Sequence, residues 1–211
     1  MCVVCVSGYG VPQPSKRAIT NMFTYNHHGA GYMFARDGKV TIHKGYDSLA
    51  DYLSDVEAEQ FTEDDVVIYH FRIATQARRH EMTQPFPLTD DEHELTSWDS
   101  VADFGVAHNG IIYKTSNGNP LLSDTALYIK DYLAPRIKTE LEIPSLLDTI
   151  ESETTGSKIA ILAGSGNYYL TGKWIYDRGL LYSNDSYQDR VYRRFTLDDV
   201  NDRWSGWTKA K

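Results

Sequence analysis

The sequence lacks the features that mark membrane, secreted and nucleic-acid-binding proteins. No apolar run approaches the roughly 20 residues that cross a bilayer, and the first residues lack the charged-then-apolar pattern of a signal peptide. Lysine and arginine form no cluster larger than an adjacent pair, as at Arg78-Arg79 and Arg193-Arg194, and the formal net charge is −8. Because a duplex binder carries a basic patch, this acidity argues against DNA or RNA binding. We therefore expect a cytoplasmic protein that binds neither nucleic acid nor membrane.

Cysteine is also scarce, since the chain has only Cys2 and Cys5. Their C-x-x-C spacing could indicate a redox pair or half of a zinc site. In the apolar run Cys2-Val3-Val4-Cys5-Val6, however, a strand would point the two thiols to opposite faces. A zinc site would need two further ligands, and no second C-x-x-C or H-x-x-x-H pattern exists. We expect Cys5 in the core, and no metal or other cofactor.

The length and composition bound the number of domains. With 211 residues and 41% hydrophobic content, the chain is long enough for one sizeable core and short for two ordinary domains. No internal repeat or Pro/Ser-rich linker divides it. We expect one domain over residues 1–211, with a solvated loop at the polar run of residues 90–94.

Early strands are predicted from apolar runs and turn signals. Residues 32–35 and 40–43 flank Asp37-Gly38, and Asp-Gly between two such runs is a strong hairpin signal. A third strand is predicted over residues 66–71, and Arg72 stands at its end.

Helices follow in the middle of the sequence and further strands come after them. An apolar stripe at helical spacing predicts a helix over residues 49–56 behind Ser48, and Ser123 would cap a second helix to about Leu133. A shorter third helix is predicted after Pro144. The remaining strands, interpreted as an antiparallel meander, are expected at 158–162, 168–171, 173–176 and 180–183. This order suits an α+β fold of two stacked, mainly antiparallel sheets covered by helices.

Cys2 directly follows the initiator methionine, so removal of Met1 would leave a thiol and a free α-amine on one residue. Such an amine, with an ordinary pKa of about 7.7–8.0, can act as the base for the thiol through one bridging water. The alternative is that Cys2 merely begins a buried first strand, because free cysteine is often buried.

Short motifs after Cys2 resemble, in their order, the class II glutamine amidotransferase domain of the N-terminal nucleophile hydrolases. The resemblance covers roughly residues 2–125, is closest to small stand-alone members, which occur in bacteria and bacteriophages, and reaches Tyr182-Ser183-Asn184 more faintly. The motifs are His70-Phe71-Arg72-Ile73-Ala74-Thr75, His108-Asn109-Gly110, Ser123-Asp124-Thr125, Asn26-His27-His28-Gly29-Ala30-Gly31 and Gln84-Pro85-Phe86.

The resemblance implies a four-layer αββα sandwich and a role for each matching residue. It makes Cys2 the nucleophile, and the Asn109 side-chain amide and the Gly110 backbone N–H the donors to the oxyanion. It implies that Arg72 binds the α-carboxylate of glutamine and that Asp124 pairs with the α-ammonium. Together, a guanidinium and a carboxylate complement the two charged groups of an α-amino acid.

Ordinary structural roles compete with these assignments. Asn109-Gly110 between two apolar runs could be a tight hairpin turn, and a turn can also expose an N–H. Arg72 could be a surface residue at a strand end, and Asp124 could simply favour the first turn of a helix.

Other residues near the motifs are assigned to the pocket. We expect three further residues to bind substrate: Thr75, Gln76 and His108. Ser183 is also expected to line the pocket. The histidines at 27, 28, 70 and 108 are not needed as bases. Where many relatives continue with His-Gly, this chain has Gln76-Ala77, which bears on glutamine specificity.

The sequence thus predicts an enzyme that hydrolyses the side-chain amide of L-glutamine through a Cys2 thioester. Because no length remains for a synthase, an ammonia-accepting partner protein is expected if the ammonia is used. Two alternatives stay open: an N-terminal nucleophile amidohydrolase acting on another amide, and a catalytically silent binding protein that retains the fold.

Overall fold

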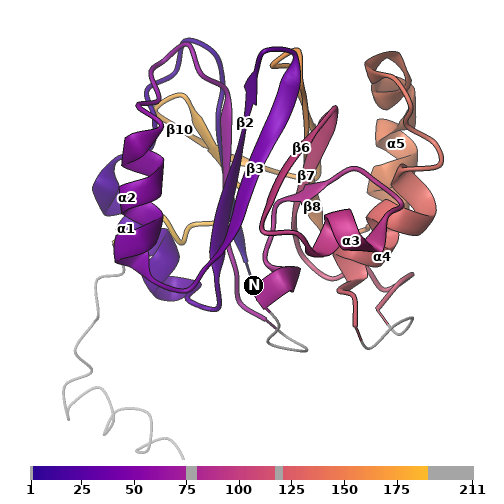
Figure 1. Cartoon of the computed structure of the whole chain (residues 1–211), viewed down its shortest axis with the longest axis horizontal. Helices are drawn as coiled ribbons and strands as arrows, with labels where there is room; N and C mark the ends of the chain where they lie inside the picture. Colours follow the sequence, from indigo (N-terminus) through magenta and orange to yellow (C-terminus); the bar gives the residue numbers. More distant parts are fainter. Residues whose placement is uncertain (1, 75–79, 117–120, 190–211) are drawn as a thin grey trace, which may run out of the picture.

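The computed structural model describes residues 2–74, 80–116 and 121–189. It has four layers, in which α1 and α2 cover a seven-stranded sheet, a four-stranded sheet stacks on the other face of that sheet, and α4 and α5 cover the outside (Figure 1). The α+β fold expected from the sequence, an αββα sandwich of two mainly antiparallel sheets, is confirmed.

The seven-stranded sheet has the order β10-β11-β1-β4-β2-β3-β6, and its neighbouring strands are antiparallel. Strand β1 lies near the middle of this sheet, between β11 and β4, and β4 leads to Arg72. The strands are β1 (Val3–Ser7), β2 (Ala30–Arg36), β3 (Lys39–Tyr46), β4 (Val67–Phe71), β6 (Asp99–Ala102), β10 (Ile175–Asp177) and β11 (Leu180–Tyr182).

The four-stranded sheet has the order β5-β7-β8-β9 and is also antiparallel. Its longest pairing joins β7 to β8 from Phe104↔Ala163 to Asn109↔Lys158, so Asn109 lies at the end of the ladder. The strands are β5 (Phe86–Pro87), β7 (Phe104–Asn109), β8 (Lys158–Ala163) and β9 (Tyr168–Thr171).

Helices begin at the serine caps that the sequence indicates. The hydroxyl of Ser48 accepts from Asp51 N, and that of Ser123 accepts from Ala126 N, which satisfies N–H groups left free in the first turn. The helical segments are α1 (Lys16–Tyr25), α2 (Leu49–Ala58), η1 (His80–Met82), α3 (Glu92–Thr96), α4 (Asp124–Tyr128), the π-helical η2 (Ile129–Leu133), η3 (Glu140–Glu142) and α5 (Ile143–Glu153). None of those among the described residues is long and apolar enough for a bilayer span.

Three apolar cores hold the four layers together, one at each interface. Along β1 the side chains alternate: Val3 and Cys5 pack against α1 and α2, whereas Val4 and Val6 pack between the two sheets. The third core joins the four-stranded sheet to α4, η2 and α5. Cys5 is buried and both cysteines are free, as the alternation predicts.

Several expectations from the sequence are confirmed and others are wrong. The hairpin is present, with Asp37 and Gly38 at φ values of 53° and 74° between β2 and β3. The predicted late meander is wrong, because β8 and β9 belong to the four-stranded sheet and β10 and β11 to the other. Residues 90–94 are not simply a loop, since Asp91 caps α3, whose Leu95 is buried. Asn109-Gly110 is not a hairpin turn either, because β7 pairs with β5 and β8.

Candidate functional site

Cys2 lies one residue before β1, at the end of the sandwich where β4 also ends. The register pairs Val3 with Phe71, so Cys2 and Arg72 are the next residues out on two neighbouring strands. The Cys2 Sγ donates to the carbonyl of Ile73 at 3.7 Å, and the Cys2 carbonyl accepts from Asn184 Nδ2 at 2.7 Å. The half-buried thiol is therefore fixed beside the strand that carries the arginine.

Arg72 and Asp124 act on the same thiol electrostatically. Burial raises the pKa of Cys2, while its hydrogen bond to Ile73 and the charge of Arg72 lower it and the charge of Asp124 raises it. Burial lowers the pKa of Arg72, which is only 7% exposed, and the charges of Cys2 and Asp124 oppose that shift. Three of the residues expected from the sequence thus share one electrostatic environment.

Asn109 reaches the same region from the other sheet. Its Nδ2 donates to the hydroxyl of Ser183 at 3.0 Å, and this hydroxyl also accepts from the backbone N–H of Val4 at 2.8 Å. Ser183 N in turn donates to the Val4 carbonyl at 2.9 Å. These hydrogen bonds connect Asn109 through Ser183 to Val4, two residues after Cys2, and do not reach the thiol itself.

Gly110 follows β7 with a backbone that only glycine accommodates easily. Its φ is 152°, and a Cβ there would lie 2.2 Å from Ser157 Oγ and 2.9 Å from Ser157 Cα. The main chain of Gly110 is therefore packed against the start of β8, which fixes the direction of its peptide groups.

The Asp124 carboxylate joins the first turn of α4 to the segment after Gly110. Its Oδ2 accepts from Ile112 N at 2.7 Å, and its Oδ1 accepts from Thr125 N at 2.9 Å. Both oxygens therefore already accept backbone hydrogen bonds, and Asp124 itself is partly exposed.

The glycine-rich segment packs against the Gln-Pro-Phe segment. A Cβ on Gly29 would lie 2.6 Å from Thr83 Oγ1, and a Cβ on Gly31 would lie 2.4 Å from the Gln84 carbonyl oxygen. Gly29 also pairs with the arginine, because Arg72 N donates to the Gly29 carbonyl at 2.8 Å. These two motifs thus meet because two residues lack side chains.

His70 and His108 are buried and uncharged near neutral pH. Burial lowers the pKa of His70 to about 3 and that of His108 to about 4. Neither is therefore a ready proton acceptor near neutral pH. Among the described residues, no group of three or more His, Cys, Asp or Glu side chains could hold a metal ion.

The predicted site residues thus fall into two groups around the ends of β1 and β7. Cys2 and Arg72 lie side by side at the ends of β1 and β4, whereas Asn109 and Gly110 lie at the end of β7, where Asp124 of α4 accepts from Ile112 N. His108 points to Thr125 of α4, while Thr75 and Gln76 lie outside the described residues. The sequence indicated no role for Thr125 or for the Gln84 side chain, although they belong to the Ser-Asp-Thr and Gln-Pro-Phe motifs.

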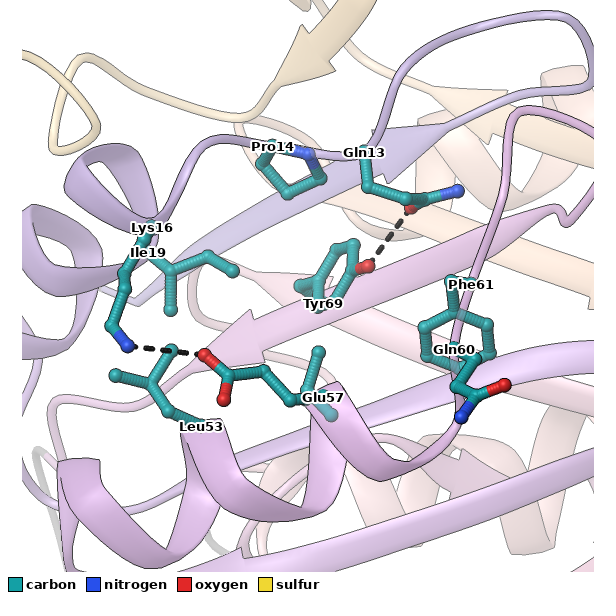
Figure 2. Close-up of a pocket in the computed structure, with 10 residues that line it drawn as sticks. Gln13, Pro14, Lys16, Ile19, Leu53, Glu57, Gln60, Phe61 and Tyr69 are labelled. Carbon is teal, nitrogen blue, oxygen red and sulfur yellow. Dashed lines mark hydrogen bonds and ion pairs between the residues drawn. The ribbon is translucent and has the colours of Figure 1, made fainter.

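A pocket of about 240 Å³ lies elsewhere, on the outer face of the seven-stranded sheet between α1 and α2 (Figure 2). Ile19, Leu53 and Phe61 form apolar walls, and Lys16 and Glu57 are joined by a 3.0 Å ion pair. None of the predicted site residues lines this pocket, so it is separate from the group around Cys2.

Comparison with known proteins shows a likeness of fold. No family model matches the sequence, and no match is found among curated proteins. Among solved structures, the glutamine phosphoribosylpyrophosphate amidotransferase from B. subtilis, complexed with ADP and GMP, is similar with a TM-score of 0.51 and 17% sequence identity. The match covers 78% of this chain and 35% of that one, so this chain spans about a third of the length of the enzyme. The likeness is one of fold alone.

Proposed function

We propose that this protein is a glutamine amidotransferase-type enzyme that hydrolyses the side-chain amide of L-glutamine through a thioester on Cys2. One observation carries the proposal: Cys2 and Arg72 are neighbours at the paired ends of β1 and β4, and the charge of Asp124 acts on both. A nucleophile, a cation for a carboxylate and an anion for an ammonium are the groups that an α-amino acid amide requires. The similarity in fold to a glutamine amidotransferase supports the same reaction.

The reaction begins with removal of Met1, which frees the α-amine of Cys2. Because an ordinary thiol has a pKa of about 8.5, most of it is protonated at neutral pH, and the amine takes its proton through a water molecule as the sulfur attacks the amide carbon. The proton then passes to the leaving nitrogen, and ammonia departs. Water attacks the resulting thioester, which releases glutamate and restores the thiol.

Asn109 and Gly110 are the proposed donors to the tetrahedral oxyanion. One hydrogen of the Asn109 amide is held by Ser183, which leaves the second available, and Gly110 presents its backbone without a side chain. Losing one such donor typically costs about 10²–10³ in rate. The donors are provided by the four-stranded sheet and the thiol by the other sheet, so stacking of the sheets assembles the site.

The direct test measures glutamate release by the purified protein and by the variant Cys2→Ala, together with the intact mass of both. Loss of Met1 in the wild type and Cys2-dependent glutamate release are the expected results. The matched control is Cys5→Ala, which removes the buried thiol that packs against α1 and α2 and leaves Cys2 in place. This control should keep its turnover per folded molecule.

Other outcomes would contradict the proposal in different ways. Equal rates in wild type and Cys2→Ala would exclude the thioester route. Cys2-dependent cleavage of other amides, with no glutamate released from glutamine, would instead make the protein an amidohydrolase of different specificity. A retained Met1 with no adduct from a glutamine-like electrophile would identify a silent binding protein.

A further inference from the structure

Gln84 occupies a special place in the register of the four-stranded sheet. Phe86 pairs with Val106 and Pro87 with Gly105, so continuation of the ladder would put Gln84 opposite His108. The strand pairing stops at Phe86, and the Gln84 side chain takes the place of the backbone acceptor, because its Oε1 accepts from His108 N at 2.6 Å. The side chain thus extends the β5–β7 pairing to the residue before Asn109.

The same side chain also contacts α4. Gln84 Nε2 donates to the Thr125 hydroxyl at 3.2 Å, and this oxygen lies 2.8 Å from His108 Nδ1. Gln84, His108 and Thr125 are 6%, 2% and 2% exposed, so the three hydrogen bonds form a closed and dry ring. Because a hydrogen bond is stronger in the low-dielectric interior than in water, these bonds restrain the three side chains that they join.

Two members of the ring are next in the chain to proposed site residues. His108 precedes Asn109 in the chain, and Thr125 follows Asp124, so each ring member other than Gln84 is covalently next to a proposed site residue. Movement of either neighbour would shift the oxyanion donor or the ammonium-binding carboxylate. Displacement by about 1 Å can cost on the order of 10²-fold in rate.

The segment that carries Gln84 is itself held on both sides. The buried ammonium of Lys44, 3% exposed, donates to the carbonyls of Glu81 at 3.1 Å and Leu95 at 2.6 Å, which bracket the segment. The same Nζ lies 4.1 Å from the centre of the Phe86 ring. Gly31 lets the Gln84 main chain approach β2 closely.

We infer that Gln84 is a positioning residue for the reaction proposed above: its side-chain amide holds His108 and Thr125, and through them Asn109 and Asp124, in the productive arrangement. Gln84 touches no reacting atom in this role. The inference rests on the proposed function and adds to it a residue outside the substrate contacts.

Two substitutions separate positioning from packing. Gln84→Met keeps the length of the side chain but neither accepts from His108 N nor donates to Thr125. Gln84→Glu can still accept from His108 N, and the Thr125 hydroxyl can donate to its second oxygen. Positioning therefore predicts that kcat falls in the order wild type, Gln84→Glu, Gln84→Met. Packing alone predicts the reverse order for the variants, because methionine suits a buried site better than a carboxylate does.

The matched control is Gln13→Met, which makes the same chemical change beside the separate outer pocket (Figure 2). Gln13 also uses both ends of its amide, accepting from Tyr69 Oη at 2.9 Å and donating to the Thr62 carbonyl at 2.7 Å. This control should lose stability without losing kcat.

The experiment measures kcat and KM for glutamine per active site, titrated with a glutamine-like electrophile, and amide hydrogen exchange at His108. For Gln84→Met we expect kcat to fall about 10–100-fold with KM changed less than about threefold, and exchange at His108 to accelerate. Wild-type kcat in Gln84→Met, or a Gln84→Glu variant slower than Gln84→Met, would overturn the inference alone. A wild type that releases no glutamate would overturn the proposed function, and with it this inference.

Discussion

The side-chain amide of Asn109, at the end of β7, donates a 3.0 Å hydrogen bond to the hydroxyl of Ser183, just beyond β11. These strands belong to different sheets, so the bond crosses the interface between the two inner layers. Because Ser183 also accepts from Val4 N, the bond connects the proposed oxyanion donor to the strand that begins after Cys2. The orientation of one amide therefore depends on how the two sheets stack.

Replacing Ser183 with alanine should impair catalysis as well as stability. Ser183→Ala leaves Val4 N and Asn109 Nδ2 without their acceptor in a buried site, which should cost about 1–3 kcal/mol in the free energy of unfolding. Without that contact the Asn109 amide can rotate, and we expect about a 10-fold loss of kcat with a smaller change in KM, since an oxyanion donor acts in the transition state. Urea unfolding and steady-state kinetics measure the two effects.

Ser7 provides the control for this prediction. It is as deeply buried as Ser183, lies at the opposite end of β1, and donates to the Val11 carbonyl at 3.2 Å. Ser7→Ala should reduce stability and leave kcat unchanged. Equal kcat losses in the two variants would mean that general loosening of β1, and not the Asn109 contact, limits turnover.

Arg72→Lys should weaken substrate binding more than turnover. Lysine keeps the positive charge but cannot grip a carboxylate with two parallel N–H groups, and its compact ammonium is harder to desolvate at a site that is 7% exposed. We expect KM for glutamine to rise about 10-fold or more, as for loss of one charge-assisted hydrogen bond. The check uses a substrate amide without the α-carboxylate: its kcat/KM should be the same in wild type and variant, and an equal loss for both substrates would contradict the assignment.

The sequence predicted the layers of the fold better than the connections between them. Strand and helix periodicity identified β2, β3, α2 and α5, because each has an apolar face of regular spacing and a clear turn or cap. The exchange of the chain from β9 to β10 between sheets has no local signal, since both strands are short and only the stacked neighbours decide where each pairs. Helix α1 was missed, although Ser15 caps it.

For the candidate site, short motifs named candidate residues but not the hydrogen bonds among them. Cys2, Arg72 and Asp124 could be named from their order in the chain, whereas the bonds of Gln84 to His108 and Thr125 span 24 and 41 positions. Such long-range hydrogen bonds depend on the register of β5 against β7, which sequence spacing does not specify. The Asn109-Gly110 corner illustrates the same limit, because a local turn signal was outweighed by pairing with distant strands.

Gly110→Ala should remove activity and destabilise the fold strongly. A methyl group there meets Ser157 Oγ at 2.2 Å and its backbone Cα at 2.9 Å, and φ is 152°, so both the chain and its neighbour must move. The matched control is Gly10→Ala, where φ is 75° and a Cβ would have no neighbour within 4 Å. This control should cost only about 1 kcal/mol for the backbone conformation. Similar losses of stability in the two variants would show that the Ser157 contact is unimportant.

Lys44 should make the stability of the protein depend on pH above neutrality. Burial lowers its pKa to about 7, whereas a lysine in the unfolded chain has a pKa of about 10.4. Between these values the unfolded state binds more protons than the folded state, so the free energy of unfolding rises with pH across that window. Below pH 7 the fold bears the full cost of burying the ammonium. Near pH 10 most of that cost is gone.

The variant Lys44→Met removes this titration, so the wild type should gain stability relative to the variant by up to about 1.4 kcal/mol per pH unit between pH 7 and 10. Comparing the two proteins cancels the contribution of every other group that titrates in the same range. Lys16→Met, which removes an exposed ammonium paired with Glu57, should leave the slope as in the wild type. Denaturant melts at half-unit pH steps measure the slopes. Parallel curves for wild type and Lys44→Met would mean that the buried amine keeps its proton through this range, held by the carbonyls of Glu81 and Leu95.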